Sequence, residues 1–246
     1  MFKTGLVSIS FRSLSAEEII RNVSKVNLEF VEWGSDIHAP FDNNESVLSI
    51  KRLSEEYGVK TSSYGTYFRI GKDKPEDIIQ YFKAAKTLGT NVLRIWIGSR
   101  GSADYTSEEK KQLYNNCITA AHLAEKEGIV LCCECHPKTL TDTVDSTMEL
   151  MQAVGCDNFR MYWQPNQFMS TEDNLLFAKK TAPFTVNIHV FNWKEKEKYP
   201  LSEGIQTWKK YLDFFDGSQK LLLEFMPDDR IESLSSETEA LQKILM

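Results

Sequence analysis

The feature that most constrains the fold of this chain is a regular alternation of two kinds of segment along its length. Short apolar segments rich in β-branched and aromatic residues are typical of buried strands, and the amphipathic segments between them are typical of helices. The strand candidates are residues 5–11, 28–33, 59–68, 92–98, 129–136, 159–164, 184–191 and 221–226. The helix candidates are residues 17–26, 47–57, 75–88, 108–127, 144–154, 172–180, 205–215 and 231–245.

Eight strands that are each followed by a helix, with starts about 30 residues apart, predict a parallel sheet. Eight such units in 246 residues match the size of a closed (β/α)8 barrel. A doubly wound open sheet is the alternative, but no glycine-rich phosphate turn follows the first strand. Because no Pro-, Gly- or Ser-rich linker divides the sequence, we expect an α/β protein with a single (β/α)8 TIM barrel domain over residues 1–246.

The charge balance and the cysteines narrow the class of protein. Lys and Arg total 29 against 35 Asp and Glu, which argues against nucleic acid or membrane as a partner because phosphates need clustered cations. No apolar run approaches the length of about 18 residues needed to cross a membrane, and no secretory signal is visible. Three of the five cysteines crowd into one strand candidate, where they make poor disulfide partners. We expect reduced thiols and a cytoplasmic location.

The fifth strand candidate, IVLCCECH, places two polar residues at its end. Side chains alternate along a strand, so Cys132, Glu134 and His136 share one face while Cys133 and Cys135 share the other. Active sites of TIM barrels lie at the carboxyl ends of the strands. We therefore expect Glu134 and His136 to face a polar pocket, and Cys133 and Cys135 to pack as small apolar residues beneath the helices.

Polar residues occur at the same height on the three later strands. Gln164 ends the sixth strand, His189 lies near the end of the seventh, and Glu224 is the only charge in the eighth. With Glu134, these residues bring two carboxylates, an imidazole and an amide oxygen to one end of the barrel. That set suits a divalent metal such as Mn²⁺, Mg²⁺, Zn²⁺ or Co²⁺. No zinc-peptidase motif, nucleophile elbow or P-loop competes with it.

The sequence resembles the xylose-isomerase-like TIM barrel family, which includes sugar phosphate isomerases and epimerases. The resemblance runs from SISFR at the first strand to LLLEFMP at the last. In that family a metal is typically held by Glu, Asp, His and Glu on strands five to eight, which implies Glu134, Gln164, His189 and Glu224 as metal ligands here. The stretch ECHPKTLTDTVDST resembles the signature of strand five, which implies that His136 contacts the substrate.

The chain also shows a narrower resemblance and one departure from the family pattern. The segments SISFR, VEWGSDIHA, RGSADYTSEE and HPKTLTDT are similar to the 3-dehydroshikimate dehydratases of siderophore synthesis, which share the barrel. Gln164 stands where the family usually has an aspartate. A glutamine offers a carbonyl oxygen but no charge, so we expect a weaker metal site than in the family.

The resemblance implies chemistry in which a proton moves beside a carbonyl group. Such a reaction needs a base, a group that returns the proton, and an electrophile for the developing oxyanion. We expect Glu134 and Glu224 to act as bases, the metal to bind the substrate oxygens, and His136 to donate a proton to a substrate hydroxyl or to orient it. The leading hypothesis is a metal-assisted isomerase or epimerase of a sugar or sugar phosphate.

Three alternatives stay open or are disfavoured. A dehydratase that acts on a cyclic keto-acid such as 3-dehydroshikimate also abstracts a proton beside a carbonyl. The neutral Gln164 instead fits a metal-poor barrel that binds a carbohydrate without turnover. An apurinic endonuclease would need a three-metal cluster richer in His and Asp, and the chain has only four histidines. The substrate and the oligomeric state, including a homo-oligomer, are left open by the sequence.

Weaker candidates for substrate contacts surround the predicted site. Arg94, in phase with Trp96 on strand four, is either an inward cation for an acidic substrate or the partner of Glu32. Lys138 and Lys194 follow strands five and seven, where a cation can meet a phosphate or carboxylate. The other rim candidates near strand ends are Arg12, Glu32, His38, Tyr64 and Tyr67. Aromatic rings near strand ends either stack on a sugar or fill the core, and these are Trp33, Tyr67, Trp96, Trp163 and Trp193.

Overall fold

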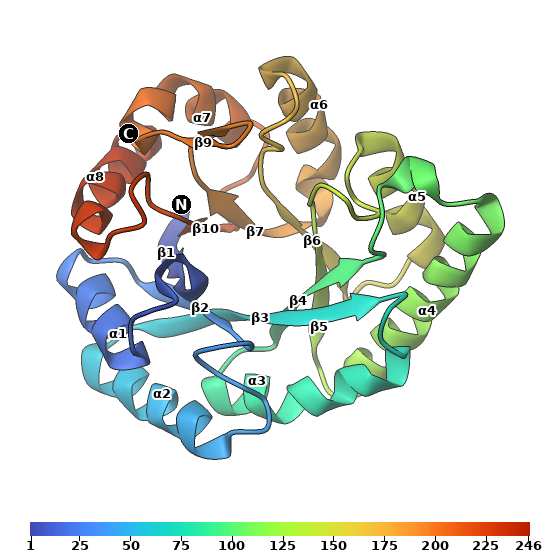
Figure 1. Ribbon diagram of the computed structural model, residues 1–246, viewed down its shortest axis with the longest axis horizontal. Helices are drawn as coiled ribbons and strands as arrows, with labels where there is room; N and C mark the ends of the chain where they lie inside the picture. Colours follow the sequence, from blue (N-terminus) through green and yellow to red (C-terminus); the bar gives the residue numbers. More distant parts are fainter.

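The computed structural model describes residues 1–246 and shows a closed barrel of parallel strands inside a ring of helices (Figure 1). The barrel strands are β1 Lys3–Val7, β2 Phe30–Gly34, β3 Lys60–Ile70, β4 Val92–Ile97, β5 Val130–Glu134, β6 Phe159–Trp163, β7 Thr185–Val190 and β10 Lys220–Leu223. The helices are α1 Ala16–Lys25, α2 Asn44–Tyr57, α3 Phe82–Leu88, α4 Ser107–Glu125, α5 Val144–Val154, α6 Thr171–Thr181, α7 Ile205–Leu212 and α8 Leu234–Leu245. The strands follow one another around the barrel in chain order, and β10 pairs with β1 to close it. The expected (β/α)8 TIM barrel is therefore confirmed.

The starts of the helices are fixed by side chains that the sequence places there. Ser15 and Thr106 each accept a hydrogen bond from the third helical N–H, and the carboxylates of Glu18 and Glu109 bond back to the capping residues. Such capping boxes satisfy two otherwise unpaired N–H groups, and an N-cap contributes about 1 kcal/mol. Helix α2 ends at Gly58, whose φ of 67° is the left-handed conformation that glycine adopts without a steric penalty.

The first strand is shorter than its apolar pattern predicts. It ends at Val7, and residues Ser8–Phe11 form the 3₁₀ turn η1 instead of continuing the strand. The hydroxyl of Ser8 accepts the N–H of Gly34 at 2.9 Å, and that of Ser10 accepts the N–H of Phe225 at 2.9 Å. These long-range hydrogen bonds tie the turn to the carboxyl ends of β2 and β10.

Several further elements depart from the expected boundaries. The segment expected as one helix over 75–88 begins as the 3₁₀ turn η2 Pro75–Tyr81, and the last helix is preceded by η6 Ile231–Ser233. Other 3₁₀ turns are η3 Ser102–Asp104, η4 Ala182–Phe184 and η5 Leu201–Gly204. The structure also contains an unexpected hairpin of β8 Trp193–Lys194 and β9 Glu197–Lys198, which lies beside α7 (Figure 1).

The main hydrophobic core lies between the barrel and the helices and contains 57 buried residues. Trp33 and Trp163 are both fully buried in it. The ring of Trp163 packs at 6.0 Å from Trp208 of α7 and at 5.2 Å from Tyr211. Of the two roles expected for these tryptophans, stacking on a sugar or filling the core, the structure therefore shows the second.

The interior of the barrel holds a smaller apolar layer and a chain of polar contacts. Cys132 packs inside with Val92 and Tyr162, whereas Cys133 and Cys135 belong to the helix-facing core, as the strand alternation predicts. Above this layer the amide of Asn187 donates to the hydroxyl of Tyr162 at 2.7 Å. The barrel thus becomes polar towards its carboxyl end.

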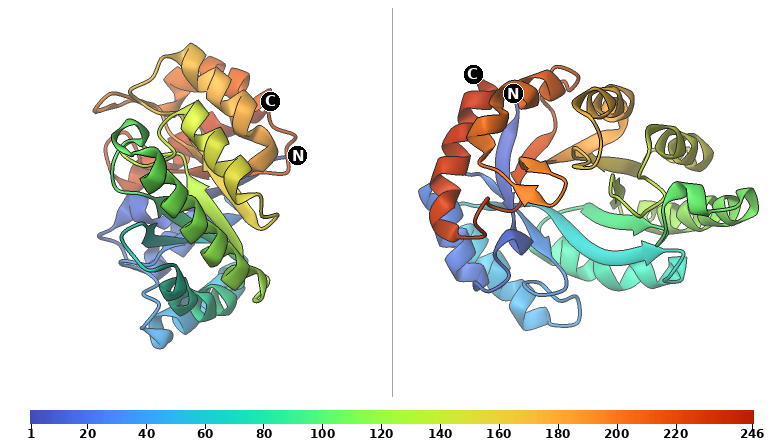
Figure 2. Two further views of the ribbon diagram at one scale, coloured as in Figure 1. Left: turned by 90° about the vertical axis from the view of Figure 1, so that its right-hand side faces the viewer. Right: turned by 45° about the horizontal axis from the view of Figure 1, so that its top comes forward.

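The two termini lie on one side of the molecule, where the first and last elements meet (Figure 2). None of the helices combines the length and the hydropathy needed to cross a membrane.

Candidate active site

A central cavity of about 200 Å³ opens at the carboxyl ends of the barrel strands. Nine of the residues singled out from the sequence line it: Arg12, Tyr67, Arg94, Trp96, Glu134, His136, Gln164, Trp193 and Glu224. A tenth, His189, is fully buried beside them and contacts Glu134, Gln164 and Glu224. Strands β4 to β7 and the residues that follow β6 and β10 therefore bring the predicted residues together.

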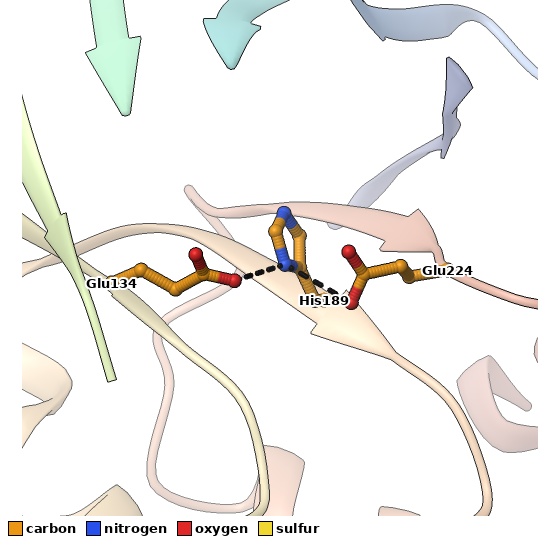
Figure 3. A group of neighbouring side chains, drawn as sticks. All are labelled: Glu134, His189 and Glu224. Atoms are coloured by element: carbon orange, nitrogen blue, oxygen red, sulfur yellow. Dashed lines mark ion pairs between the residues drawn. The ribbon is translucent and has the colours of Figure 1, made fainter. Parts of the chain in front are cut away.

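The imidazole of His189 is the centre of this group. Its Nδ1 lies 3.0 Å from Oε1 of Gln164, 3.2 Å from Oε1 of Glu134 and 3.4 Å from Oε2 of Glu224. Figure 3 shows the two carboxylates on either side of the ring. One possible ligand atom from each of Glu134, His189 and Glu224 can be chosen so that all lie within 4.8 Å of one another.

The second carboxylate oxygen of Glu134 is held by two donors from β4. Oε2 accepts from Nη1 of Arg94 at 2.5 Å and from Nε1 of Trp96. Burial alone would raise the pKa of Glu134, but Arg94 and His189 outweigh it and hold the pKa well below the usual range for a glutamate. Glu134 is therefore ionised, with Oε2 fixed and Oε1 directed towards His189.

A third buried carboxylate, Glu32 of β2, completes the network. Its oxygens lie 3.2 Å from Nε of Arg94 and 3.6 Å from Nε2 of His189. Burial raises the pKa of Glu32, and the neighbouring Arg94 and His189 offset this and bring it below the ordinary value. Of the two roles expected for Arg94, the structure shows the partner of Glu32, and Arg94 also bridges Glu32 to Glu134.

The ion pair between Glu32 and Arg94 requires a glycine on the neighbouring strand. A Cβ on Gly65 of β3 would lie 2.7 Å from an oxygen of Glu32 and 3.0 Å from Nη2 of Arg94. From the sequence, Glu32 is expected only as one of the weaker candidates at the rim. The signal that identifies it as buried is the one used for Glu224, because Glu32 is the only charge in the otherwise apolar strand FVEWG.

His136 lies two residues beyond the end of β5 and lines the central cavity. Its Nδ1 is 2.7 Å from the carbonyl oxygen of Pro137. Because a carbonyl only accepts hydrogen bonds, Nδ1 carries a proton and Nε2 is the nitrogen left to exchange one with a ligand. The ring also packs at 5.5 Å from Trp96.

The remaining rim candidates are distributed unevenly. Arg12 lines the central cavity and pairs with Asp36 at 2.5 Å. Lys194 is exposed on β8 and borders a neighbouring cavity, whereas the exposed Lys138 lines neither of these two cavities. His38 contacts the Ser8 hydroxyl at 3.1 Å and takes part in loop structure.

Aromatic side chains form two walls of the central cavity. Tyr67 and Trp96 pack edge to face at 5.3 Å on one wall, and Phe191, Trp193 and Phe225 supply the other. The Trp193 and Phe225 rings lie 5.2 Å apart. Tyr64 does not take part, because its hydroxyl is buried against the carbonyl of Ala39. Flat apolar walls over a polar base are typical of pockets that bind rings.

The donor set fits a divalent cation. Oε1 of Glu134, a carboxylate oxygen of Glu224, the carbonyl oxygen of Gln164 and Nδ1 of His189 converge, and these atom types suit Mn²⁺, Mg²⁺, Zn²⁺ or Co²⁺. Glu32 lies 3.6 Å from Nε2 of His189, on the side where a carboxylate commonly orients a metal-binding imidazole. The amide of Gln164 is the only neutral oxygen donor among these four candidate ligands.

Comparison with protein families and with curated proteins gives two findings. A family model described as the xylose isomerase-like TIM barrel matches residues 20–242 of this chain. The curated 3-dehydroshikimate dehydratase of Bacillus anthracis is 35% identical over 72 residues, which cover 29% of this chain and 26% of that enzyme. The sequence match thus spans well under two thirds of the relative.

Comparison with solved structures finds the same barrel in several enzymes. The probable 3-DHS dehydratase of petrobactin synthesis from Bacillus anthracis has a TM-score of 0.85 at 21% identity, over 98% of this chain and 99% of that one. A D-psicose 3-epimerase from Clostridium cellulolyticum H10 has a TM-score of 0.69 at 11% identity, over 99% and 97%. A xylose isomerase-like protein from Mycobacterium smegmatis in complex with magnesium gives 0.74 at 12%, over 99% and 97%. At these identities the structures show a common fold.

Proposed function

Since the chain belongs to the xylose isomerase-like TIM barrel family, we propose that it is an enzyme that moves a proton on the carbon beside a carbonyl group of a small polyhydroxylated substrate. The observation that carries this proposal is the state of Glu224. Its carboxylate borders the central cavity, and its only ion-pair partner is Nδ1 of His189 at 3.4 Å. A carboxylate with few competing donors is available to accept a proton from a bound substrate.

A divalent cation would be held by Glu134, Gln164, His189 and Glu224. When bound, such a cation supplies Lewis-acid stabilisation of the negative charge that develops on the substrate carbonyl oxygen. Gln164 contributes an oxygen without a charge, so the site binds a cation less tightly than one with a carboxylate at this position. Which of the divalent metals is used depends on affinity and supply in the cell.

The two carboxylates of the site have different tasks in this proposal. Glu134 is committed through Oε2 to Arg94 and Trp96, and its lowered pKa makes it a poor proton acceptor. We therefore assign cation binding alone to Glu134, whereas Glu224 both contributes to the cation site and abstracts the proton. This assignment narrows the expectation that both carboxylates act as bases.

His136 supplies the second proton-transfer group. Its Nδ1–H is committed to the carbonyl of Pro137, so Nε2 exchanges protons with the substrate. The packing against Trp96 fixes the plane of the ring in the cavity. A positioned imidazole near neutral pH contributes a factor of about 10²–10⁴ to such proton transfers.

The pairing of a carboxylate with an imidazole supports elimination of water best. Glu224 takes the proton from the carbon beside the carbonyl, and the electron pair of that C–H bond forms a carbon–carbon double bond. The bond from the next carbon to its hydroxyl breaks, and protonated His136 donates its proton to that hydroxyl, which leaves as water. A cyclic hydroxy-keto acid such as 3-dehydroshikimate has the required arrangement, and the curated relative carries that activity by name.

Isomerisation or epimerisation of a sugar or sugar phosphate is the second candidate. The specific observation in its favour is the placement of Glu134 and Glu224 on either side of the His189 ring (Figure 3). Two proton-transfer groups on opposite sides of one carbon allow a proton to leave one face and return to the other. The structural neighbour named D-psicose 3-epimerase has the same fold.

The experiment that tests the proposal is incubation of the Mn²⁺-loaded protein in D₂O with 3-dehydroshikimate, D-fructose, D-tagatose and D-psicose. Dehydration produces an aromatic catechol acid with a new ultraviolet absorption. Isomerisation or epimerisation instead exchanges a carbon-bound hydrogen for deuterium without that absorption. Absence of both signals with every compound of the panel contradicts the proposed proton transfer.

The setting of the enzyme follows from its charge and thiols. All five cysteines are free, which supports a reducing compartment such as the cytoplasm. The formal net charge of −6 supports a small-molecule substrate over a nucleic acid.

A further inference from the structure

A second cavity adjoins the central one and has nearly the same size. This side cavity, of about 180 Å³, lies between the segment that follows β6, the β8–β9 hairpin and helix α7. Its volume far exceeds the 10–15 Å³ or so that one water molecule needs. Gln167, Phe191 and Trp193 line both cavities, so the two share a wall.

The walls of the side cavity are fixed by hydrogen bonds within the protein. Asn174 of α6 donates to the carbonyls of Asn166 and Ser170, and the indole N–H of Trp208 donates to the carbonyl of Phe191 at 2.9 Å. These buried groups hold the loop after β6 and helix α7 against the barrel. The cavity is therefore a built feature of the fold and not a gap between loose segments.

Other polar groups of the lining are free to bind a ligand. The indole N–H of Trp193 is buried without a hydrogen bond, and Gln167 and Thr207 add an amide and a hydroxyl to the lining. Asn192 donates its amide N–H to the carbonyl of Pro200, which leaves its oxygen free to accept. Leaving a buried donor unpaired is unfavourable, so a ligand that accepts a hydrogen bond from Trp193 gains affinity.

The charges around the side cavity favour a neutral ligand. The only charged lining residues are Lys194 and Glu203, one of each sign, and both are exposed at the rim. Amides and hydroxyls both donate and accept, which matches the hydroxyl groups of a sugar ring. The rings of Trp193, Trp208 and Tyr211 supply apolar surface for its carbon-bound hydrogens.

We propose that the side cavity binds a second, uncharged polyhydroxylated ring of a substrate whose reacting part lies in the central cavity. The inference rests on the proposed function for the identity of the reacting part, but the binding that it predicts can be measured without turnover. The preferred substrate is then a carbonyl compound that carries a second sugar ring, in place of the reacting part alone.

The test compares a ketose disaccharide with its reacting half. Calorimetric titration of the Mn²⁺-loaded protein with lactulose and with D-fructose should show at least tenfold tighter binding of lactulose, equivalent to about 1.4 kcal/mol. Equal affinity for the two sugars, or no measurable binding of lactulose, overturns the proposal.

A filled-cavity variant locates the second ring. Thr207→Trp places an indole in the side cavity and should lower lactulose affinity to the level of D-fructose while D-fructose binding is unchanged. Gln206→Trp, an exposed neighbour on α7, is the matched control and should bind both sugars as the wild type does. Where Thr207→Trp melts early, Thr207→Leu tests the same point with less bulk. Undiminished lactulose binding by a folded Thr207 variant contradicts the assignment.

The same samples separate this inference from the proposed function. Deuterium exchange into bound lactulose in D₂O reports proton transfer, whereas the titration reports only binding. Tight lactulose binding without exchange or elimination contradicts the proposed chemistry and leaves the side cavity assignment intact. Exchange into D-fructose with no preference for lactulose contradicts the side cavity assignment and leaves the proposed chemistry intact.

Discussion

The two halves of the candidate active site differ in how their charged groups are partnered. On the β2–β5 half, Glu32, Arg94 and Glu134 form a closed network in which Arg94 lies 3.2 Å from one carboxylate and 2.5 Å from the other. On the β6–β10 half, Gln164 and Glu224 have little besides Nδ1 of His189. We call these the clamped half and the open half.

This difference indicates that, among the residues around the central cavity, some fix the geometry of the site and others carry out the chemistry. Burial of Arg94 lowers its pKa, but Glu134 and Glu32 outweigh this and raise it, so the guanidinium stays charged and its carboxylates stay ionised. Groups stabilised in one protonation state are poor at exchanging protons. The clamped half therefore orients, and the open half is available to react.

The largest loss of activity is expected when the carboxylate of the open half is neutralised. Glu224→Gln should lower kcat/KM by a factor of about 10²–10⁴ because it removes the proton acceptor, with the melting temperature nearly unchanged. The measurement is steady-state kinetics on whichever compound of the substrate panel is turned over, with a thermal melt of each variant. Glu134→Gln is the counterpart in the clamped half and should lower stability and cation affinity as well. Full activity in folded Glu224→Gln removes this residue from the chemistry.

The second largest effect is expected on the stability of the protein when the cation of the clamped half is removed. Arg94→Met keeps the volume but leaves two buried carboxylates without their cation, so the free energy of unfolding should fall by about 3–5 kcal/mol. Urea denaturation measures this change. Arg69→Met is the control. The Arg69 guanidinium lies 4.4 Å from the centre of the Trp96 ring, beside the clamped half, but it pairs with no carboxylate. An equal loss in both variants shows that packing and not ion pairing holds this half.

A smaller effect, on cation affinity, tests whether Gln164 of the open half is a ligand. Gln164→Asp adds a charge beside the proposed cation and should tighten Mn²⁺ binding about tenfold, or about 1.4 kcal/mol, although the shorter side chain limits the gain. Calorimetric titration of Mn²⁺ into the metal-free proteins measures it. Gln167→Glu adds the same charge at the cavity rim and should gain less. Unchanged or weaker binding in folded Gln164→Asp means that this residue is not a ligand.

The smallest effect concerns the layer behind the clamped half. Burial raises the pKa of Cys133 to about 12, and that of Cys135 is raised well above the ordinary thiol value, so both should resist thiol reagents in the native protein. Cys156 is only partly buried and should react first. Titration with Ellman's reagent before and after unfolding in urea measures this. Rapid labelling of Cys133 and Cys135 in the native protein contradicts their placement on the helix-facing side of β5.

The open half could be predicted from the sequence because it depends on one periodic signal. Gln164, His189 and Glu224 each stand out as polar residues near the end of an apolar strand, and a barrel brings such ends together. The fold followed from the same signal repeated along the chain. Agreement of local pattern and global architecture makes such features predictable.

The clamped half could be predicted only in part. The sequence indicates Glu134 at the site and offers Glu32 as one of two partners for Arg94, but the choice between them depends on register between strands. Arg94 meets Glu32 only because Gly65, paired with both β2 and β4, leaves room between them. A glycine in a strand has many uses, and its sequence does not say which side chains approach it. The end of β1 at Val7 likewise depends on distant hydrogen bonds. The strands of the β8–β9 hairpin have two residues each, which is too short for an alternation of apolar and polar residues to be recognised in the sequence.

The hydrogen bond from the N–H of Phe225 to the hydroxyl of Ser10 joins residues 215 positions apart in the chain. Phe225 directly follows the proposed base and has a φ of 55°, a conformation that an aromatic residue adopts only when its surroundings fix it. Glu224 is thus placed by the pairing of the last strand with the first. Contacts of such separation are slow to form in folding. A nascent chain that has not yet released its last strand cannot close the barrel and lacks the proposed base, so the site is completed only when the two ends of the chain meet.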